Sequence, residues 1–135
     1  MYTPTMKGKV YVIGAGGGDP DLLTVQATRL LRNAEVVLHD DEVAPEILAL
    51  IPASTQVRNT GKLGVPQAQV QEKIQSLLIS AAREGHQVVH LTVRDPLLSG
   101  RPTKEMEALA RAGVAFEVIS AAEPALGAAA GAGSL

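Results

Sequence analysis

The chain has 135 residues, of which 46% are hydrophobic, and its formal net charge at pH 7 is −2. A chain of this size buries one hydrophobic core, and its slightly acidic charge excludes the basic surface that sequence-independent binding to nucleic acid requires. There is no cysteine, and no apolar run approaches the roughly 18 residues of a membrane-spanning helix, so we predict a cytoplasmic protein with no nucleic-acid or membrane partner.

Apolar, β-branched runs alternate with amphipathic segments along the chain. The runs that predict strands are 9–15, 34–40, 55–60, 87–93 and 115–120, and the third has the weakest apolar content, which favours a sheet edge. Helical periodicity covers 23–34, 44–51, 67–83 and 106–110. The alternation predicts an α/β fold with a doubly wound, mostly parallel five-stranded sheet flanked by helices.

In such a sheet, ligands bind beyond the carboxyl ends of the strands, which here are residues 14–21, 39–42 and 92–101. The first of these segments is a glycine-rich turn, "GAGGGDPD". It is not a dinucleotide fingerprint, because Asp19 stands where the third glycine belongs, and no Gly-Lys-Ser/Thr follows. Two interpretations stay open: a turn whose backbone N–H groups approach a ligand, or a tight strand-to-helix connection with an acidic cap.

Two longer segments resemble a known family. They are "VYVIGAGGGDPDLLTVQATRLLRNAEVVLHD" (10–40) and "VVHLTVRDPLLSGRPTKEMEALARAGVAFEVIS" (88–120). Both are similar to segments of the tetrapyrrole (corrin/porphyrin) methylases, most closely the N-terminal domain of the uroporphyrinogen-III C-methyltransferases. The resemblance implies that residues 1–135 are the N-terminal domain of a two-domain enzyme. Residues 121–135 would then begin the interdomain segment, and the C-terminal domain would be absent from this chain.

The resemblance also implies an activity. Members of this family transfer a methyl group from S-adenosylmethionine to carbon atoms of a tetrapyrrole, on the way to sirohaem or cobalamin, and act as homodimers. We therefore expect S-adenosylmethionine as cofactor, a tetrapyrrole of the uroporphyrinogen III type as substrate, and no activity from this domain alone.

Site residues follow from the same resemblance, position by position. It implies a cofactor site at Gly14, Gly16, Gly18, Asp19, Pro20, Asp95 and Pro96, and substrate contacts at Gly100, Arg101 and Lys62. Asp40 is implied as the catalytic residue. This assignment is chemically sound, because methylation of a pyrrole carbon releases a proton that a carboxylate can accept.

The sequence departs from the family pattern at several places in the implied cleft. Gly17 replaces a proline, His39 and Asp41 replace a tyrosine and an arginine, and Val93 and Arg94 replace a pair of glycines. We expect the last two side chains to fill space where a cofactor would pack against backbone, and Asp41 to repel an anionic substrate. A second hypothesis is therefore a degenerate methylase-like domain that serves as a binding or dimerisation module.

A methylase of ribosomal RNA or diphthamide shares this architecture, but the "GDPDLLT" motif and the acidic charge disfavour it. The run "HDDE" (39–42) also fits a solvated loop and helix cap. His39, His86 and His90 stand at no ligand spacing, so we predict structural roles for them and no metal site.

Overall fold

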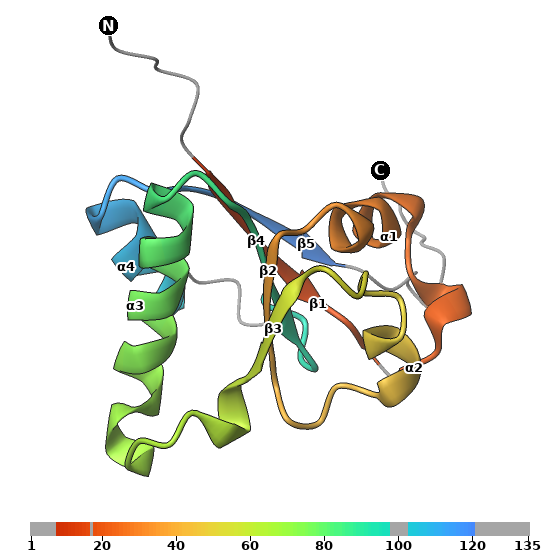
Figure 1. Ribbon diagram of the computed structural model, residues 1–135, viewed down its shortest axis with the longest axis horizontal. Helices are drawn as coiled ribbons and strands as arrows, with labels where there is room; N and C mark the ends of the chain where they lie inside the picture. The colour runs from red at the N-terminus through yellow and green to blue at the C-terminus, as the bar shows by residue number, and fades with distance from the viewer. Residues whose placement is uncertain (1–7, 17, 98–102, 121–135) are drawn as a thin grey trace, which may run out of the picture.

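The sheet contains five strands: β1 (Lys9–Gly14), β2 (Val36–His39), β3 (Gln56–Asn59), β4 (Gln87–Thr92) and β5 (Ala115–Ser120) (Figure 1). The computed structural model describes residues 8–16, 18–97 and 103–120. Neighbouring strands are parallel throughout, in the order β3-β2-β4-β1-β5. This confirms the predicted doubly wound sheet, and β3 lies at an edge as its weak apolar content indicated.

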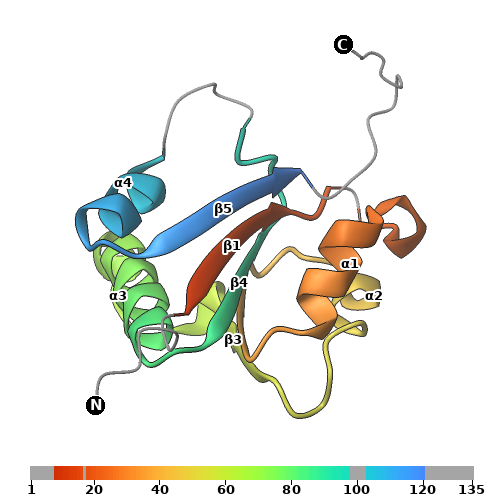
Figure 2. The same ribbon diagram turned by 90° about the horizontal axis from the view of Figure 1, so that it is seen from above.

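Helices cover both faces of the sheet (Figure 2). Helices α1 (Val25–Arg32) and α2 (Pro45–Leu48) pack on one face, and α3 (Val70–Arg83) and α4 (Lys104–Arg111) pack on the other. The short 3-10 turns η2 (Pro20–Leu22), η3 (Thr60–Lys62) and η4 (Gln67–Gln69) lie in the connections. The chain moves across the sheet in one direction from β1 to β3 and then returns, so right-handed crossovers put the two helix pairs on opposite faces.

Side-chain caps decide where α1 and α4 begin. The hydroxyl of Thr24 accepts a hydrogen bond from the N–H of Ala27 at 3.1 Å, and that of Thr103 accepts one from the N–H of Met106 at 3.2 Å. Helix α1 therefore begins later than the apolar periodicity predicted, and α4 begins earlier. Periodicity reports which side chains face the core, whereas the first turn of a helix depends on a cap for its free N–H groups.

Alternation along the strands divides the core into two clusters. The cluster under α1 and α2 includes Ile13, Leu31, Val37, Ile47, Val89 and Leu91. The cluster under α3 and α4 includes Val10, Val12, Leu38, Leu78, Val88 and Leu109. Each fully buried leucine contributes about 1.5–3 kcal/mol through removal of its apolar surface from water. Asp40 and His90 each stand two residues after a member of the second cluster, Leu38 and Val88. The same alternation therefore turns both side chains toward α3 and α4.

The carboxyl ends of β1 and β4 lie side by side. After β1 the chain continues to α1 on one face of the sheet, and after β4 it continues to α4 on the other face. Gly14 at the end of β1 is in register with Thr92 at the end of β4, and the turn that follows β4 packs over Gly14. A Cβ atom at Gly14 would stand 2.8 Å from Pro96 Cδ and 3.0 Å from the carbonyl oxygen of Arg94, so only glycine fits. Adjacent strands whose connections diverge in this way leave a crevice between them.

Candidate functional site

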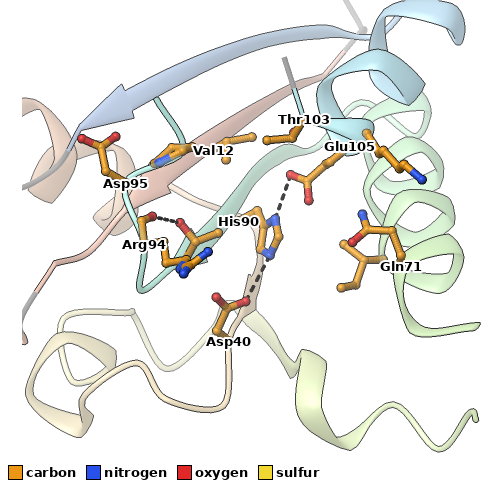
Figure 3. A pocket seen from close by; sticks show the side chains of 12 residues that line it. Val12, Asp40, Gln71, His90, Arg94, Asp95, Thr103 and Glu105 are labelled. Atoms are coloured by element: carbon orange, nitrogen blue, oxygen red, sulfur yellow. Dashed lines mark hydrogen bonds and ion pairs between the residues drawn. The ribbon is translucent and has the colours of Figure 1, made fainter. Parts of the chain in front are cut away.

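A pocket opens at this end of the sheet, on the face covered by α3 and α4 (Figure 3). Its volume is about 590 Å³, within the range of small-molecule binding sites. Charged and titratable side chains line it: Asp40, His90, Arg94, Asp95, Lys104 and Glu105. Among the residues predicted from the sequence, the pocket brings together Asp40, Asp95 and Pro96.

Asp40 directly follows β2 and is held by groups from two other segments. Its Oδ2 accepts a hydrogen bond from the N–H of Val93 at 3.3 Å, and Thr60 Oγ1 lies 3.5 Å from Oδ1. Burial raises the pKa of Asp40, but His90 and these two donors outweigh it and lower the pKa below its ordinary value. With 37% of its side chain exposed, Asp40 is an ionised carboxylate at the mouth of the pocket.

His90 lies between two carboxylates and is almost completely buried, with 4% of its side chain exposed. Its Nδ1 is hydrogen-bonded to Glu105 Oε2 at 2.8 Å, whereas its Nε2 lies 3.6 Å from Asp40 Oδ1. The second separation is an ion-pair contact, and Nε2 has no hydrogen-bond partner among the described residues. Burial opposes charge on the ring, but Asp40 and Glu105 outweigh it and raise the pKa of His90 to about 9.

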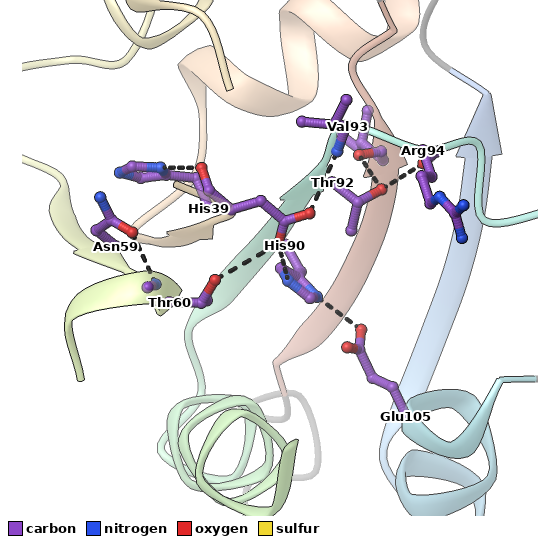
Figure 4. Close-up of polar contacts among 11 residues, drawn as sticks. His39, Asn59, Thr60, His90, Thr92, Val93, Arg94 and Glu105 are labelled. Atoms are coloured by element: carbon purple, nitrogen blue, oxygen red, sulfur yellow. Dashed lines mark hydrogen bonds and ion pairs between the residues drawn. The ribbon is translucent and has the colours of Figure 1, made fainter. Parts of the chain in front are cut away.

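Hydrogen bonds within the turn after β4, one of which is drawn in Figure 4, and one from β5 hold this turn in place. Thr92 Oγ1 donates to the carbonyl of Arg94 at 2.7 Å. Asp95 accepts from the N–H of Leu97 at 2.9 Å and from the hydroxyl of Ser120 at 3.3 Å. These contacts fix the direction in which Asp95 and Arg94 leave the end of β4.

Val93 and Arg94, which stand where the family has glycines, take different directions after β4. Val93 is half-buried and packs against the core cluster under α1 and α2, so it does not fill the pocket. The alternation of side chains continues past the end of β4 and turns Val93 away from the face that carries Asp40. Arg94 is exposed and lines the pocket, as expected for a side chain added to that space.

None of the described residues of the glycine turn lines the pocket. Gly16 and Gly18 have positive φ angles of 69° and 97°, a conformation that favours glycine. Asp19 caps η2 by accepting from the N–H of Asp21 at 2.9 Å, and Pro20 begins that turn. The acidic-cap geometry is therefore present, while the predicted role of these residues in cofactor binding stays a prediction.

The remaining predicted residues are spread more widely. Lys62 is exposed at the end of η3. Asp41 is exposed, does not line the pocket, and accepts a hydrogen bond from the amide of Asn59 at 2.8 Å. Gly100 and Arg101 lie outside the described residues, as do residues 121–135.

Sequence reasoning assigned His90 a structural role only and did not consider Glu105. The available signal was the alternation in "VVHLT", which places His90 on the same strand face as Val88 and Thr92. Alternation does not reveal that β4 pairs with β2, and it is this pairing that places His90 beside Asp40.

In the part of the chain that the structure describes, every helix is too short or too polar to span a membrane. No group of three histidine, aspartate or glutamate side chains in those residues has an arrangement that would hold a metal ion.

Comparison with known proteins gives the same family by sequence and by structure. Siroheme synthase of Chromobacterium violaceum is 45% identical over 126 residues, which are 93% of this chain and 27% of that protein. Uroporphyrinogen-III C-methyltransferase of Synechococcus elongatus is 40% identical over 123 residues, 91% of this chain and 51% of that protein. This chain thus spans about half or less of the length of these relatives.

Solved structures agree with the sequence relatives. Uroporphyrin-III C-methyl transferase from Thermus thermophilus, complexed with S-adenyl homocysteine, matches with a TM-score of 0.68 and 39% identity, over 85% of this chain and 48% of that one. Residues 9–135 match the family described as Tetrapyrrole (Corrin/Porphyrin) Methylases. The match of the family over residues 9–135, the sequence relatives and the shared fold together show that the chain belongs to the tetrapyrrole methylase family.

Proposed function

We propose that this chain forms the N-terminal half of the active-site cleft of an S-adenosylmethionine-dependent C-methyltransferase. Its substrate would be a tetrapyrrole of the uroporphyrinogen III type, in sirohaem or cobalamin biosynthesis. One observation carries the proposal: in a member of the tetrapyrrole methylase family, an ionised carboxylate, Asp40, stands at the mouth of a pocket at the carboxyl ends of the strands. In this proposal a C-terminal domain completes the cleft, the domain alone is inactive, and the enzyme is a homodimer.

The chemistry of the pocket suits S-adenosylmethionine. The carboxylates of Asp40 and Asp95 complement a cationic ligand, and the hydroxyls of Thr92 and Thr103 can bond to a ribose or an amino-acid group. Because Val93 packs into the core, its side chain does not oppose binding there. Asp95 and Pro96 are the pocket residues we propose for the cofactor, together with Gly14, Gly16, Gly18, Asp19 and Pro20 of the glycine turn. Once bound, the cofactor supplies an electrophilic methyl group.

Asp40 is the residue we propose as the proton acceptor. Forming a bond between a methyl group and a pyrrole carbon requires that the carbon lose its proton, and a carboxylate within reach can take it. The lowered pKa keeps Asp40 ionised at neutral pH, so the acceptor is always available. The N–H of Val93 contacts Oδ2 of the carboxylate, and the hydroxyl of Thr60 contacts Oδ1.

Basic side chains around the pocket favour a substrate that carries several carboxylates. Arg94 and Lys104 line the pocket, and Lys62 is exposed beside Thr60, which contacts Asp40. The negative charge of Asp41 is partly met by the amide of Asn59, which moderates the repulsion expected from the sequence. Cations at the mouth of a cleft raise the local concentration of an anionic substrate.

Calorimetric titration of S-adenosylhomocysteine tests the proposal. It is run on this chain and on a longer protein in which the chain is joined to a C-terminal methylase domain. We expect binding in the longer protein, weakened by Asp95→Ala, and little or none in this chain alone. A matched control is Asp41→Ala, because Asp41 is exposed and does not line the pocket. Absence of binding in both proteins would reject the methyltransferase proposal and favour a degenerate binding or dimerisation module.

A further inference from the structure

Three charged side chains form a row across the pocket from β2 to α4: Asp40, His90 and Glu105 (Figure 3). Asp40 follows β2, His90 lies in β4 beside Leu38 of β2, and Glu105 lies in the first turn of α4. His90 and Glu105 are buried, whereas Asp40 is partly exposed. This charged row therefore runs from the interior to the pocket, with Asp40 at its open end.

The positions of the two ring nitrogens favour the protonated imidazole. Nδ1 lies 2.8 Å from the Glu105 carboxylate and donates its proton there. A neutral ring with its proton on Nδ1 would turn the lone pair of Nε2 toward Asp40 Oδ1, 3.6 Å away. Two lone pairs that face each other repel, and the repulsion is stronger at a buried site, whereas an N–H on Nε2 attracts the carboxylate.

The orientation of Asp40 depends on His90. Oδ2 is held by the N–H of Val93 at 3.3 Å, but Oδ1 has only the contacts to His90 at 3.6 Å and to Thr60 at 3.5 Å. Without a cation at position 90, Oδ1 would keep one contact at the outer limit of a hydrogen bond. The carboxylate would then lose the buried positive charge beside it and would be freer to turn.

We propose that His90 is a positioning residue, whose buried imidazolium, anchored by Glu105, holds the Asp40 carboxylate ionised and directed into the pocket. The inference rests on the proposed function, in which Asp40 accepts a proton. It assigns His90 no contact with the substrate, since 4% exposure leaves little of the ring accessible.

Other charged groups around His90 complete its electrostatic surroundings. Lys104 of α4 and Arg94 and Asp95 of the turn after β4 line the same pocket. The pocket-lining residues of β1 and α3 are Val12, Gln71 and Ile74, and none of them is ionisable. Among the described residues, the ion pairs of His90 are those with Asp40 and Glu105, so these two carboxylates are the groups to vary.

NMR titration of this chain tests the inference without any methyl transfer. The ¹⁵N signals of His90 should report an imidazolium between pH 6 and 8, and Glu105→Gln should move its titration midpoint to lower pH. In His90→Gln the carboxyl carbon of Asp40 should titrate at higher pH than in the unaltered chain. His90→Arg should restore the low midpoint, because it restores a cation. His86→Gln is the matched control and should leave the Asp40 midpoint unchanged.

A neutral His90 at pH 7, or an Asp40 midpoint that His90→Gln does not move, would overturn the inference. If His90→Gln does not fold, the titrations of the unaltered chain and of Glu105→Gln decide the question. The result is separable from the proposed function. If the titrations of His90 and Asp40 are coupled but S-adenosylhomocysteine does not bind, the methyltransferase proposal is rejected and the role of His90 toward Asp40 is kept. If S-adenosylhomocysteine binds but the two titrations are independent, only the role of His90 is rejected.

Discussion

A histidine with two carboxylate neighbours lies toward each end of the sheet, and the two sites differ in exposure. His86, just before β4, lies 3.6 Å from Glu35 and 3.6 Å from Glu84, and 37% of its side chain is exposed. His90, within β4, has carboxylates at 2.8 and 3.6 Å, and 4% of its side chain is exposed. The arrangement of charges is similar, but water reaches the imidazole of His86 and hardly reaches that of His90.

The contrast shows that burial, rather than the number of neighbouring carboxylates, separates a candidate site from an ordinary charged surface. An exposed ion pair contributes about 0–1 kcal/mol, because water and salt screen it. At the buried end each charge depends on its neighbours, and removal of one leaves another without compensation. Substitutions at matched positions of the two ends can measure this difference.

The largest effect, on the free energy of unfolding, is expected when the row of Asp40, His90 and Glu105 loses the cation His90. His90→Leu leaves Glu105 buried without a counter-charge, so the free energy of unfolding should fall by about 3–5 kcal/mol, as measured by chemical denaturation. The double variant His90→Leu with Glu105→Leu should recover most of this loss, because it buries no charge. A double variant as unstable as the single one would contradict this account.

A second comparison sets the carboxylate beside His90 against one beside His86. In a protein that joins this chain to a C-terminal methylase domain, Asp40→Asn should lower kcat for methyl transfer by about a hundredfold or more, because the proposed proton acceptor is lost. Affinity for S-adenosylhomocysteine should change little. Glu35→Gln, the matched control at the other end of the sheet, should leave both unchanged. Equal losses of rate and affinity in Asp40→Asn would indicate a structural role.

The pH dependence of stability should come from the buried end. The pKa of His90 is raised to about 9 in the folded chain from 6.5, so His90 stabilises the fold fully below pH 6.5. That contribution, on the order of 1–3 kcal/mol, should be lost as pH rises from 6.5 to about 9, because the unfolded chain releases its proton first. Urea denaturation across this range measures the loss, and a curve of equal slope in His90→Gln would refute its assignment to His90.

The smallest effect on stability is expected at His86, the exposed histidine. His86→Gln removes two long contacts that water already screens, so stability at pH 6 should change by no more than about 0.5 kcal/mol. The same denaturation experiment, run beside His90→Gln, gives the comparison. A loss at His86 as large as that at His90 would remove the distinction between the two ends.

Much of the fold could be predicted from local sequence signals. The apolar runs and the amphipathic stripes give the order of strands and helices, and the weak apolar content of 55–60 identifies the edge strand. The position of Asp40 at a strand end was also predictable, because it follows a β-branched run. The direction of Val93 was not, since it depends on whether alternation continues into the turn after β4.

The sequence by itself determined the α/β class, the family and the segments that meet at the carboxyl ends of the strands, because periodicity and motifs are properties of neighbours along the chain. Tertiary structure decided that His90 joins Asp40 and Glu105. These contacts require β4 to lie beside β2 and α4 to pack over that face. Strand order and burial arise only when distant segments pack together, and they turn three separate side chains into one electrostatic unit.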